Sequence, residues 1–123
     1  MNKKIHTEKA PAALGPYSQG VQTGSTLYTS GQLGMKDGVL PEGIVAQATQ
    51  SLENVKAILN EAGYEMSDIV KTLVFLADIK DFAAFNEIYA KYINGPVLPA
   101  RSCVQVAALP KGALCEVEVI AIK

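Results

Sequence analysis

One segment of the 123-residue chain, Ile69 to Ala77, is apolar at both odd and even positions. Lys71 and Thr72 are its only polar residues, so a β-strand formed by this segment needs cover on both of its faces. The segment therefore predicts an interior strand of a sheet. The rest of the chain must cover two sheet faces, or one face must be covered by another molecule.

Helical periodicity accompanies this strand on both sides. Apolar residues recur at steps of three and four from Ile44 to Ala62 and predict one helix, which Gly63 would end in the left-handed conformation. A second helix is expected at residues 82–92, with Asp81 as its N-cap and Asn94 just beyond its end. The further strands expected are Tyr17–Thr23 and Thr26–Ser30, forming a hairpin around Gly24, and Ser102–Ala107 and Leu114–Ile122, joined by a turn around Pro110.

This order of elements predicts a single α/β sandwich domain over residues 1–123, with a mixed sheet and both helices on one sheet face. The opposite face then has no cover from the chain itself, although the interior strand is apolar there as well. We therefore expect a homo-oligomer in which other copies of the chain bury that face.

Composition limits the kinds of partner. Eleven basic and twelve acidic residues give a net charge of −1, so nucleic acid is not expected as the main partner. The two cysteines form no C-x-x-C pair and are expected to be reduced thiols. Residues 1–10 do not resemble a signal peptide, and no apolar run is long enough to span a bilayer, so we expect a cytoplasmic protein with no membrane partner.

Charged residues near the C-terminus suggest a site. Alternation along the last strand places Glu116 and Glu118 on one face. Arg101 follows Pro99 at the start of the strand expected beside it, and its planar guanidinium suits a carboxylate. Two interpretations remain open at this point: Arg101 anchors an anionic ligand, or it forms a structural ion pair with Glu116.

Other reactive residues are sparse. His6 is the only histidine, which disfavours both a metal cluster and a Ser-His-Asp arrangement. Cys103 is interpreted as a partly buried small side chain rather than a nucleophile, although Arg101 nearby would lower the pKa of its thiol. Gly31 would let a ligand approach the backbone closely.

Several segments, in order, resemble signature segments of the RidA (YjgF) family. The main ones are Gly15–Gln19, Thr29–Gln32 and Pro99–Cys103. The likeness continues through Asp81, Phe82, Asn86 and Tyr89, then Ala108–Lys111, and finally Glu116 and Glu118, so it covers essentially the whole chain. Leu98, where relatives often carry an aromatic residue, and the loop Met35–Gly43 depart from the family pattern.

The resemblance implies a chorismate-mutase-like α/β fold and a homotrimer whose sheets pack into a central barrel, with three ligand clefts between subunits. It also implies hydrolysis of reactive enamines and imines, such as 2-aminoacrylate and 2-iminobutyrate, to 2-oxo acids and ammonia. No cofactor and no metal would be needed.

Carried over by position, the resemblance assigns roles to individual residues. Arg101 would bind the substrate carboxylate, and Glu116 would hold and polarise the attacking water. The residues expected to contact the substrate are Tyr17, Ser30, Gly31, Phe82, Asn86 and Cys103, some of them from an adjacent subunit.

Two other function classes remain as alternatives. One is an endoribonuclease or translation inhibitor, and the other is a non-catalytic protein that binds small carboxylates or acts like a chaperone. Turnover of an imine is the measurement that separates the deaminase from both.

Overall fold

The apolar segment forms β5 (Ile69–Leu76), an interior strand between β6 (Ala100–Gln105) and β7 (Cys115–Ile122) in a computed structural model that describes residues 1–123. β6 runs parallel to β5 and β7 runs antiparallel to it, so the sheet is mixed, as predicted. The other strands are β1 (Asn2–Ile5), β2 (Gly20–Thr23), β3 (Thr26–Thr29) and β4 (Gln32–Leu33), and the order is β1-β2-β3-β7-β5-β6, with β4 paired to β7.

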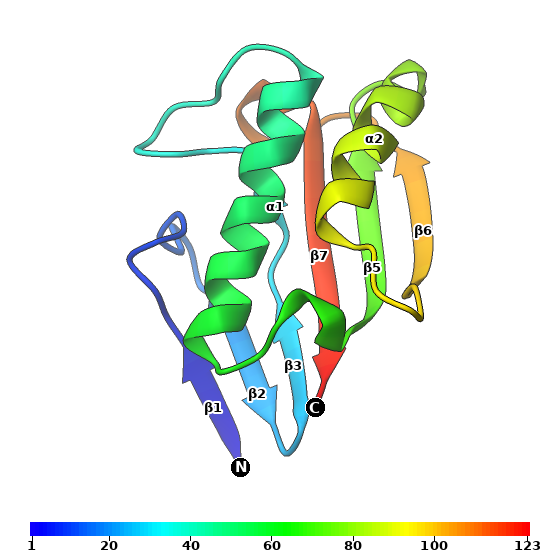
Figure 1. Cartoon of the computed structure of the whole chain (residues 1–123). Helices are drawn as coiled ribbons and strands as arrows, with labels where there is room; N and C mark the ends of the chain where they lie inside the picture. The colour runs from blue at the N-terminus through cyan, green and yellow to red at the C-terminus, as the bar shows by residue number, and fades with distance from the viewer.

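Both helices, α1 (Ile44–Glu61) and α2 (Phe82–Tyr92), lie on the same face of this sheet, as Figure 1 shows. The core between the two layers is a cluster of 18 buried residues, including Leu52, Val74 and Val117 at 0 % exposure. Gly63 takes a φ of 81° after α1, which confirms the predicted helix end. The expected placement of two helices on one face is therefore confirmed.

α1 also fixes the short strand β4. The Ser51 hydroxyl donates to the Gln32 carbonyl at 2.6 Å, and the Asn54 amide donates to the Leu33 and Met35 carbonyls at 3.0 and 2.9 Å. Ser51 and Asn54 are buried, so these bonds satisfy polar groups that would otherwise lie unpaired in the core.

The second sheet face is open within the chain. Leu73 and Phe75 of β5 point to this face and are half-buried, while Val104 of β6 is 44 % exposed. Glu116 and Glu118 lie on the same face, opposite Phe75 and Leu73. β5 is thus fully covered only on its helix side, and burial of the other face against further copies stays a prediction.

Four expectations needed correction. β1 was missed because three of its four residues are exposed and leave no apolar pattern, and β4 because two residues carry no periodicity. Asp81 precedes α2 but makes no capping bond; instead Asp78 accepts from the Lys80 N–H one turn earlier. The strands carrying Arg101 and Glu116 are not neighbours, because β5 lies between them.

Neither helix has the length and apolar character required to cross a membrane.

Candidate functional site

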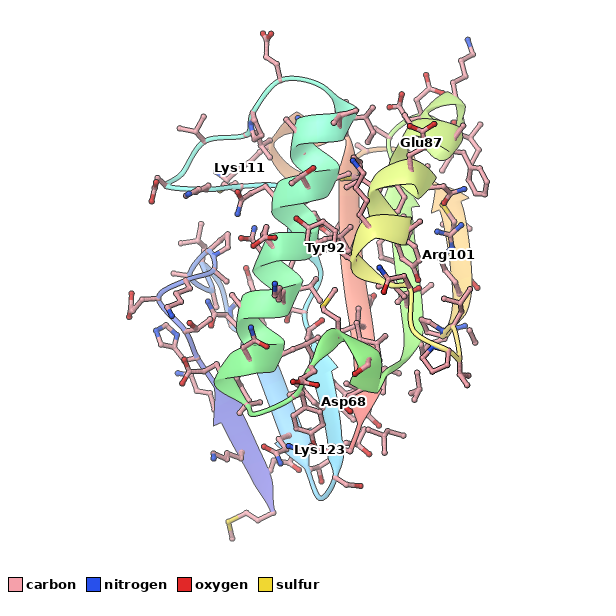
Figure 2. The ribbon with its side chains drawn as sticks, viewed as in Figure 1. Asp68, Glu87, Tyr92, Arg101, Lys111 and Lys123 are labelled. Atoms are coloured by element: carbon pink, nitrogen blue, oxygen red, sulfur yellow. The ribbon has the colours of Figure 1, made fainter.

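Arg101 lies on the helix side of the sheet edge, beside α2 (Figure 2). Its Cα pairs with Thr72 of β5, whose side chain is fully buried under the helices. The guanidinium carbon lies 4.7 Å from the ring centroid of Tyr89 and 5.6 Å from that of Phe82, both on α2. The side chain is half-buried, yet no side-chain hydrogen bond or ion pair within the chain involves it.

The structural ion pair between Arg101 and Glu116 does not exist within this chain. The only basic and acidic side chains within salt-bridge distance are His6 and Glu8, which form an ion pair only when His6 is protonated. Arg101 faces the helices, whereas Glu116 pairs with Phe75 on the open face. All five guanidinium N–H donors therefore remain free for an anion, which favours the first of the two interpretations.

Glu116 lies in a cavity of about 240 Å³ together with Tyr17 and Gly31. The bonds from α1 to β4 position this region, because Leu33 of β4 pairs with Glu116 of β7. A Cβ at residue 31 would overlap with the Glu116 carboxylate, so glycine is required for the carboxylate to lie against the backbone there. Three of the eight predicted site residues thus meet in one cavity.

The environment of Glu116 favours its protonated form. Burial raises the pKa of this carboxyl group above its ordinary value, and the nearby Glu118 charge raises it further. A carboxylate with a raised pKa is a better proton acceptor near neutral pH, which is the property required to activate water.

The raised pKa predicts that Glu116→Gln increases stability at neutral pH. The folded chain holds the Glu116 proton more tightly than the unfolded chain, so the free energy of unfolding falls as pH rises from the ordinary to the raised pKa. Removing the charge should raise Tm by a few degrees at neutral pH and should change Tm little at a pH below the range in which carboxyl groups titrate. Calorimetry across this pH range checks the prediction, with the exposed Glu87→Gln as control; an unchanged or lower Tm at neutral pH contradicts it.

The other predicted site residues lie elsewhere. Phe82, Cys103 and Asn86 belong to the α2 and β6 region around Arg101, and the Asn86 Oδ1 is buried without a hydrogen-bond partner. Burial raises the pKa of the Cys103 thiol, while Arg101 opposes that shift. Ser30 donates its hydroxyl to the Ser18 carbonyl at 2.6 Å, so its proton is already used within the chain.

Several residues of these two regions were not among the predicted site residues. Pro110 and Lys111 line the Glu116 cavity from the turn before β7, where Lys111 takes a φ of 57°. Tyr89 was recognised only as a periodic residue of the second helix and as part of a family pattern, and Thr72 only as a polar residue in an apolar strand. The unusual position of Thr72 was the one available signal for its role.

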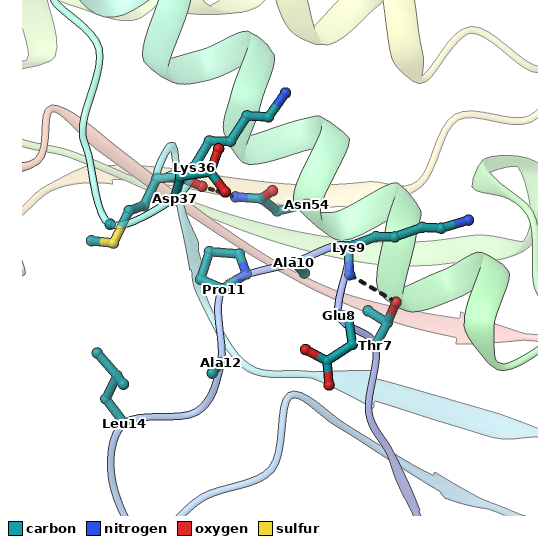
Figure 3. A pocket seen from close by; sticks show the side chains of 12 residues that line it. Thr7, Glu8, Lys9, Ala10, Pro11, Ala12, Leu14, Lys36, Asp37 and Asn54 are labelled. Carbon is teal, nitrogen blue, oxygen red and sulfur yellow. Dashed lines mark hydrogen bonds between the residues drawn. The ribbon is translucent and has the colours of Figure 1, made fainter.

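A larger cavity of about 390 Å³ lies between the N-terminal segment and α1 (Figure 3). Its lining comes from Thr7–Ala12, the loop after β4 and Asn54, and includes none of the predicted site residues. The Asn54 amide is already bonded to backbone carbonyls there. Size alone therefore does not make it the functional site.

The single histidine and the acidic residues form no alternative catalytic or metal site. His6 is exposed and lies 3.0 Å from the Glu8 carboxylate, with no nucleophile bonded to it. Within the chain no three His, Cys, Asp or Glu side chains come together as a metal site would require.

Comparisons with known proteins cover nearly all of the chain or the whole of it. A family model described as Endoribonuclease L-PSP matches residues 7–123. A Salmonella typhimurium protein named 2-iminobutanoate/2-iminopropanoate deaminase is 52 % identical over 100 % of this chain and 99 % of its own length. The crystal structure of Escherichia coli TdcF with bound serine superposes with a TM-score of 0.95 at 47 % identity, covering 98 % of both chains. RidA from an Antarctic Psychrobacter also superposes at 0.95, with 50 % identity over 98 % of this chain and 99 % of that one.

Proposed function

Because this chain belongs to the RidA (YjgF) family, we propose that it deaminates 2-imino acids such as 2-iminobutanoate and 2-iminopropanoate. The observation that carries the proposal is the Arg101 guanidinium, which is half-buried, held against two rings and free of any ion pair or hydrogen bond in its own chain. A planar cation presented in this way suits a small carboxylate. The serine bound by TdcF is likewise a small molecule with a carboxylate.

In the proposed reaction, Arg101 binds the substrate carboxylate through two parallel hydrogen bonds and so orients the molecule. Glu116 accepts a proton from a water molecule as the water oxygen attacks the imine carbon, forming a carbinolamine. Glu116 then gives this proton to the nitrogen. As the C–N bond breaks and the C=O bond forms, the carbinolamine hydroxyl loses its proton to the Glu116 carboxylate, and ammonia and a 2-oxo acid leave. The protonated imine is already electrophilic, so positioning and a placed water suffice and the chain's own side chains carry every step.

The positions of Arg101 and Glu116 require two copies of the chain to form one site. In a 2-imino acid the carboxylate carbon is bonded directly to the imine carbon, so Arg101 and Glu116 must contact neighbouring atoms. Within one chain they lie on opposite sheet faces, about 10 Å apart across β5 and about 10 Å apart along it. We therefore assign Arg101 and Glu116 of one site to different subunits of a homotrimer, whose open sheet faces pack together.

Imine turnover tests the proposal directly. A pyridoxal-phosphate dehydratase supplies 2-iminobutanoate in the assay, and the release of ammonia and 2-oxobutanoate is followed with and without the protein. The protein should accelerate that release. No acceleration over the spontaneous reaction would reject the deaminase and leave a non-catalytic carboxylate-binding protein, which titration with 2-oxobutanoate would still detect.

Mixed oligomers test the assignment of one site to two subunits. Glu116→Gln and Arg101→Ala chains, each inactive alone, should regain activity when they are coexpressed, because some interfaces combine an intact Arg101 with an intact Glu116. Random assembly in equal amounts gives about one quarter intact sites. We expect about that fraction of wild-type activity in the purified mixture, whereas sites formed within one chain would remain inactive at every ratio.

Incubation of a labelled RNA with the purified protein tests the alternative function of an endoribonuclease. The net charge of −1 and the exposed His6, whose only side-chain partner is Glu8, give RNA cleavage no support in this structure. Cleavage that disappears in Arg101→Ala would assign an RNA-directed activity to the same region.

A further inference from the structure

Two aromatic rings hold the Arg101 guanidinium. Phe82 and Tyr89 are seven residues apart on α2, so they lie on one helix face, directed at β6. The Tyr89 ring is the nearer one, at 4.7 Å from the guanidinium carbon to the centroid. A cation over a ring face is attracted by the ring quadrupole, and no other interaction in the chain holds this guanidinium.

The Tyr89 ring is itself fixed in place. Its hydroxyl lies 2.9 Å from the Thr72 hydroxyl, and Thr72 has no exposed surface. Phe85 packs against the same ring at a centroid distance of 5.9 Å. Thr72 is also the Cα partner of Arg101 between β5 and β6. Thr72 therefore holds the Tyr89 ring, and that ring contacts the guanidinium of Arg101, which lies beside Thr72 on the neighbouring strand.

We propose that Tyr89, locked by its hydrogen bond to Thr72, is a positioning residue that sets the orientation of the Arg101 guanidinium before a carboxylate binds. This inference rests on the function proposed above. The ring reduces the freedom of a long side chain in the unliganded protein, so less of that freedom is lost on binding. It also fixes the plane in which the carboxylate is received, and with it the position of the imine carbon relative to the attacking water.

Replacing the ring tests this proposal most strongly. Tyr89→Leu should lower kcat/KM for the imine about tenfold, within the range expected when a half-buried cation loses its aromatic partner. KM should rise because the carboxylate binds less well, and kcat should fall because the bound molecule is less well oriented. Tyr89→Phe keeps the ring and loses only the hydrogen bond to Thr72, so its kcat/KM should fall less, by about two- to fivefold.

The hydrogen bond to Thr72 is tested by a double-mutant cycle. Tyr89→Phe and Thr72→Val each remove the same bond, so each should reduce kcat/KM by a similar factor of about two to five, and the double variant should be no worse than either. Independent, additive losses would overturn the link. Tyr92→Phe is the matched control: Tyr92 lies on α2 like Tyr89, but its hydroxyl donates to Glu53 of α1 at 2.6 Å, away from Arg101. Losing that bond should leave the kinetics unchanged.

Ligand titration separates this proposal from the proposed function. Calorimetry with 2-oxobutanoate should show about tenfold weaker binding for Tyr89→Leu, whereas 2-oxobutanamide, which has no carboxylate, should bind both proteins equally. A general loss of structure would weaken both ligands and would overturn the inference. If the wild type binds 2-oxobutanoate and Tyr89→Leu binds it equally well, the inference fails even though the deaminase stands. If the wild type shows no imine turnover, the deaminase fails, while a selective loss of carboxylate binding in Tyr89→Leu still supports the role of Tyr89.

Discussion

Arg101→Ala should lower kcat/KM for 2-iminobutanoate by about 10²- to 10⁴-fold, because two hydrogen bonds to a charged group contribute about 1.5–3 kcal/mol each. The guanidinium has no ion pair or hydrogen bond in its own chain, so its removal leaves no buried partner unpaired. The fold should therefore survive with a nearly unchanged Tm, and the loss should be one of activity. Kinetics with dehydratase-generated imine, together with a thermal melt, check both parts.

Arg101→Lys separates charge from shape. A lysine keeps the positive charge but lacks the planar fork, so it should recover only part of the activity, mainly through KM. The exposed Lys91→Ala on α2 is the control for loss of a nearby positive charge and should behave as wild type. Full activity in Arg101→Ala would reject the carboxylate anchor and the mechanism built on it.

The parts of the fold that the sequence predicts well are those encoded by local periodicity. Apolar residues that recur at steps of three and four from Ile44 predicted the end of α1 to within one residue. Alternation of side chains along the last strand predicted the two faces of β7. Each pattern is repeated over several turns or pairs, so one exception does not obscure it. β1 and β4 lack such repetition, and their pairing depends on partners far away in the chain.

The candidate site was predictable residue by residue but not as an arrangement. Residue chemistry and family resemblance indicated Arg101 and Glu116. Their relation depends on strand order and register. β5 lies between two strands that follow one another in sequence, and Arg101 pairs with Thr72 whereas Glu116 pairs with Phe75, so the two side chains lie on opposite faces. Sequence spacing alone could not separate an internal ion pair from a site shared between chains.

The second large effect concerns Gly34, which lies where β4 meets α1. Gly34→Ala should destabilise the protein by about 3 kcal/mol, at the upper end of the range for an overpacked core. The added Cβ would overlap with the backbone of Gln47, and backbone atoms cannot swing aside as a side-chain tip can. Gln47 is also held at 2.8 Å by bonds to the Pro41 carbonyl and the Leu114 N–H, so a shift of α1 would strain both bonds.

Urea denaturation at a fixed protein concentration measures the loss, because stability of an oligomer depends on concentration. Gly95→Ala is the matched control: a Cβ there meets no atom within 4 Å, and its φ is not in the left-handed region, so its stability should stay within about 0.5 kcal/mol of wild type. β4 pairs with the strand segment that carries Glu116, so Gly34→Ala should also lower deaminase activity in the fraction that folds. Equal urea midpoints for Gly34→Ala and Gly95→Ala would show that α1 can move away from β4 at little cost. Tight packing between α1 and β4 would then not explain the position of Glu116.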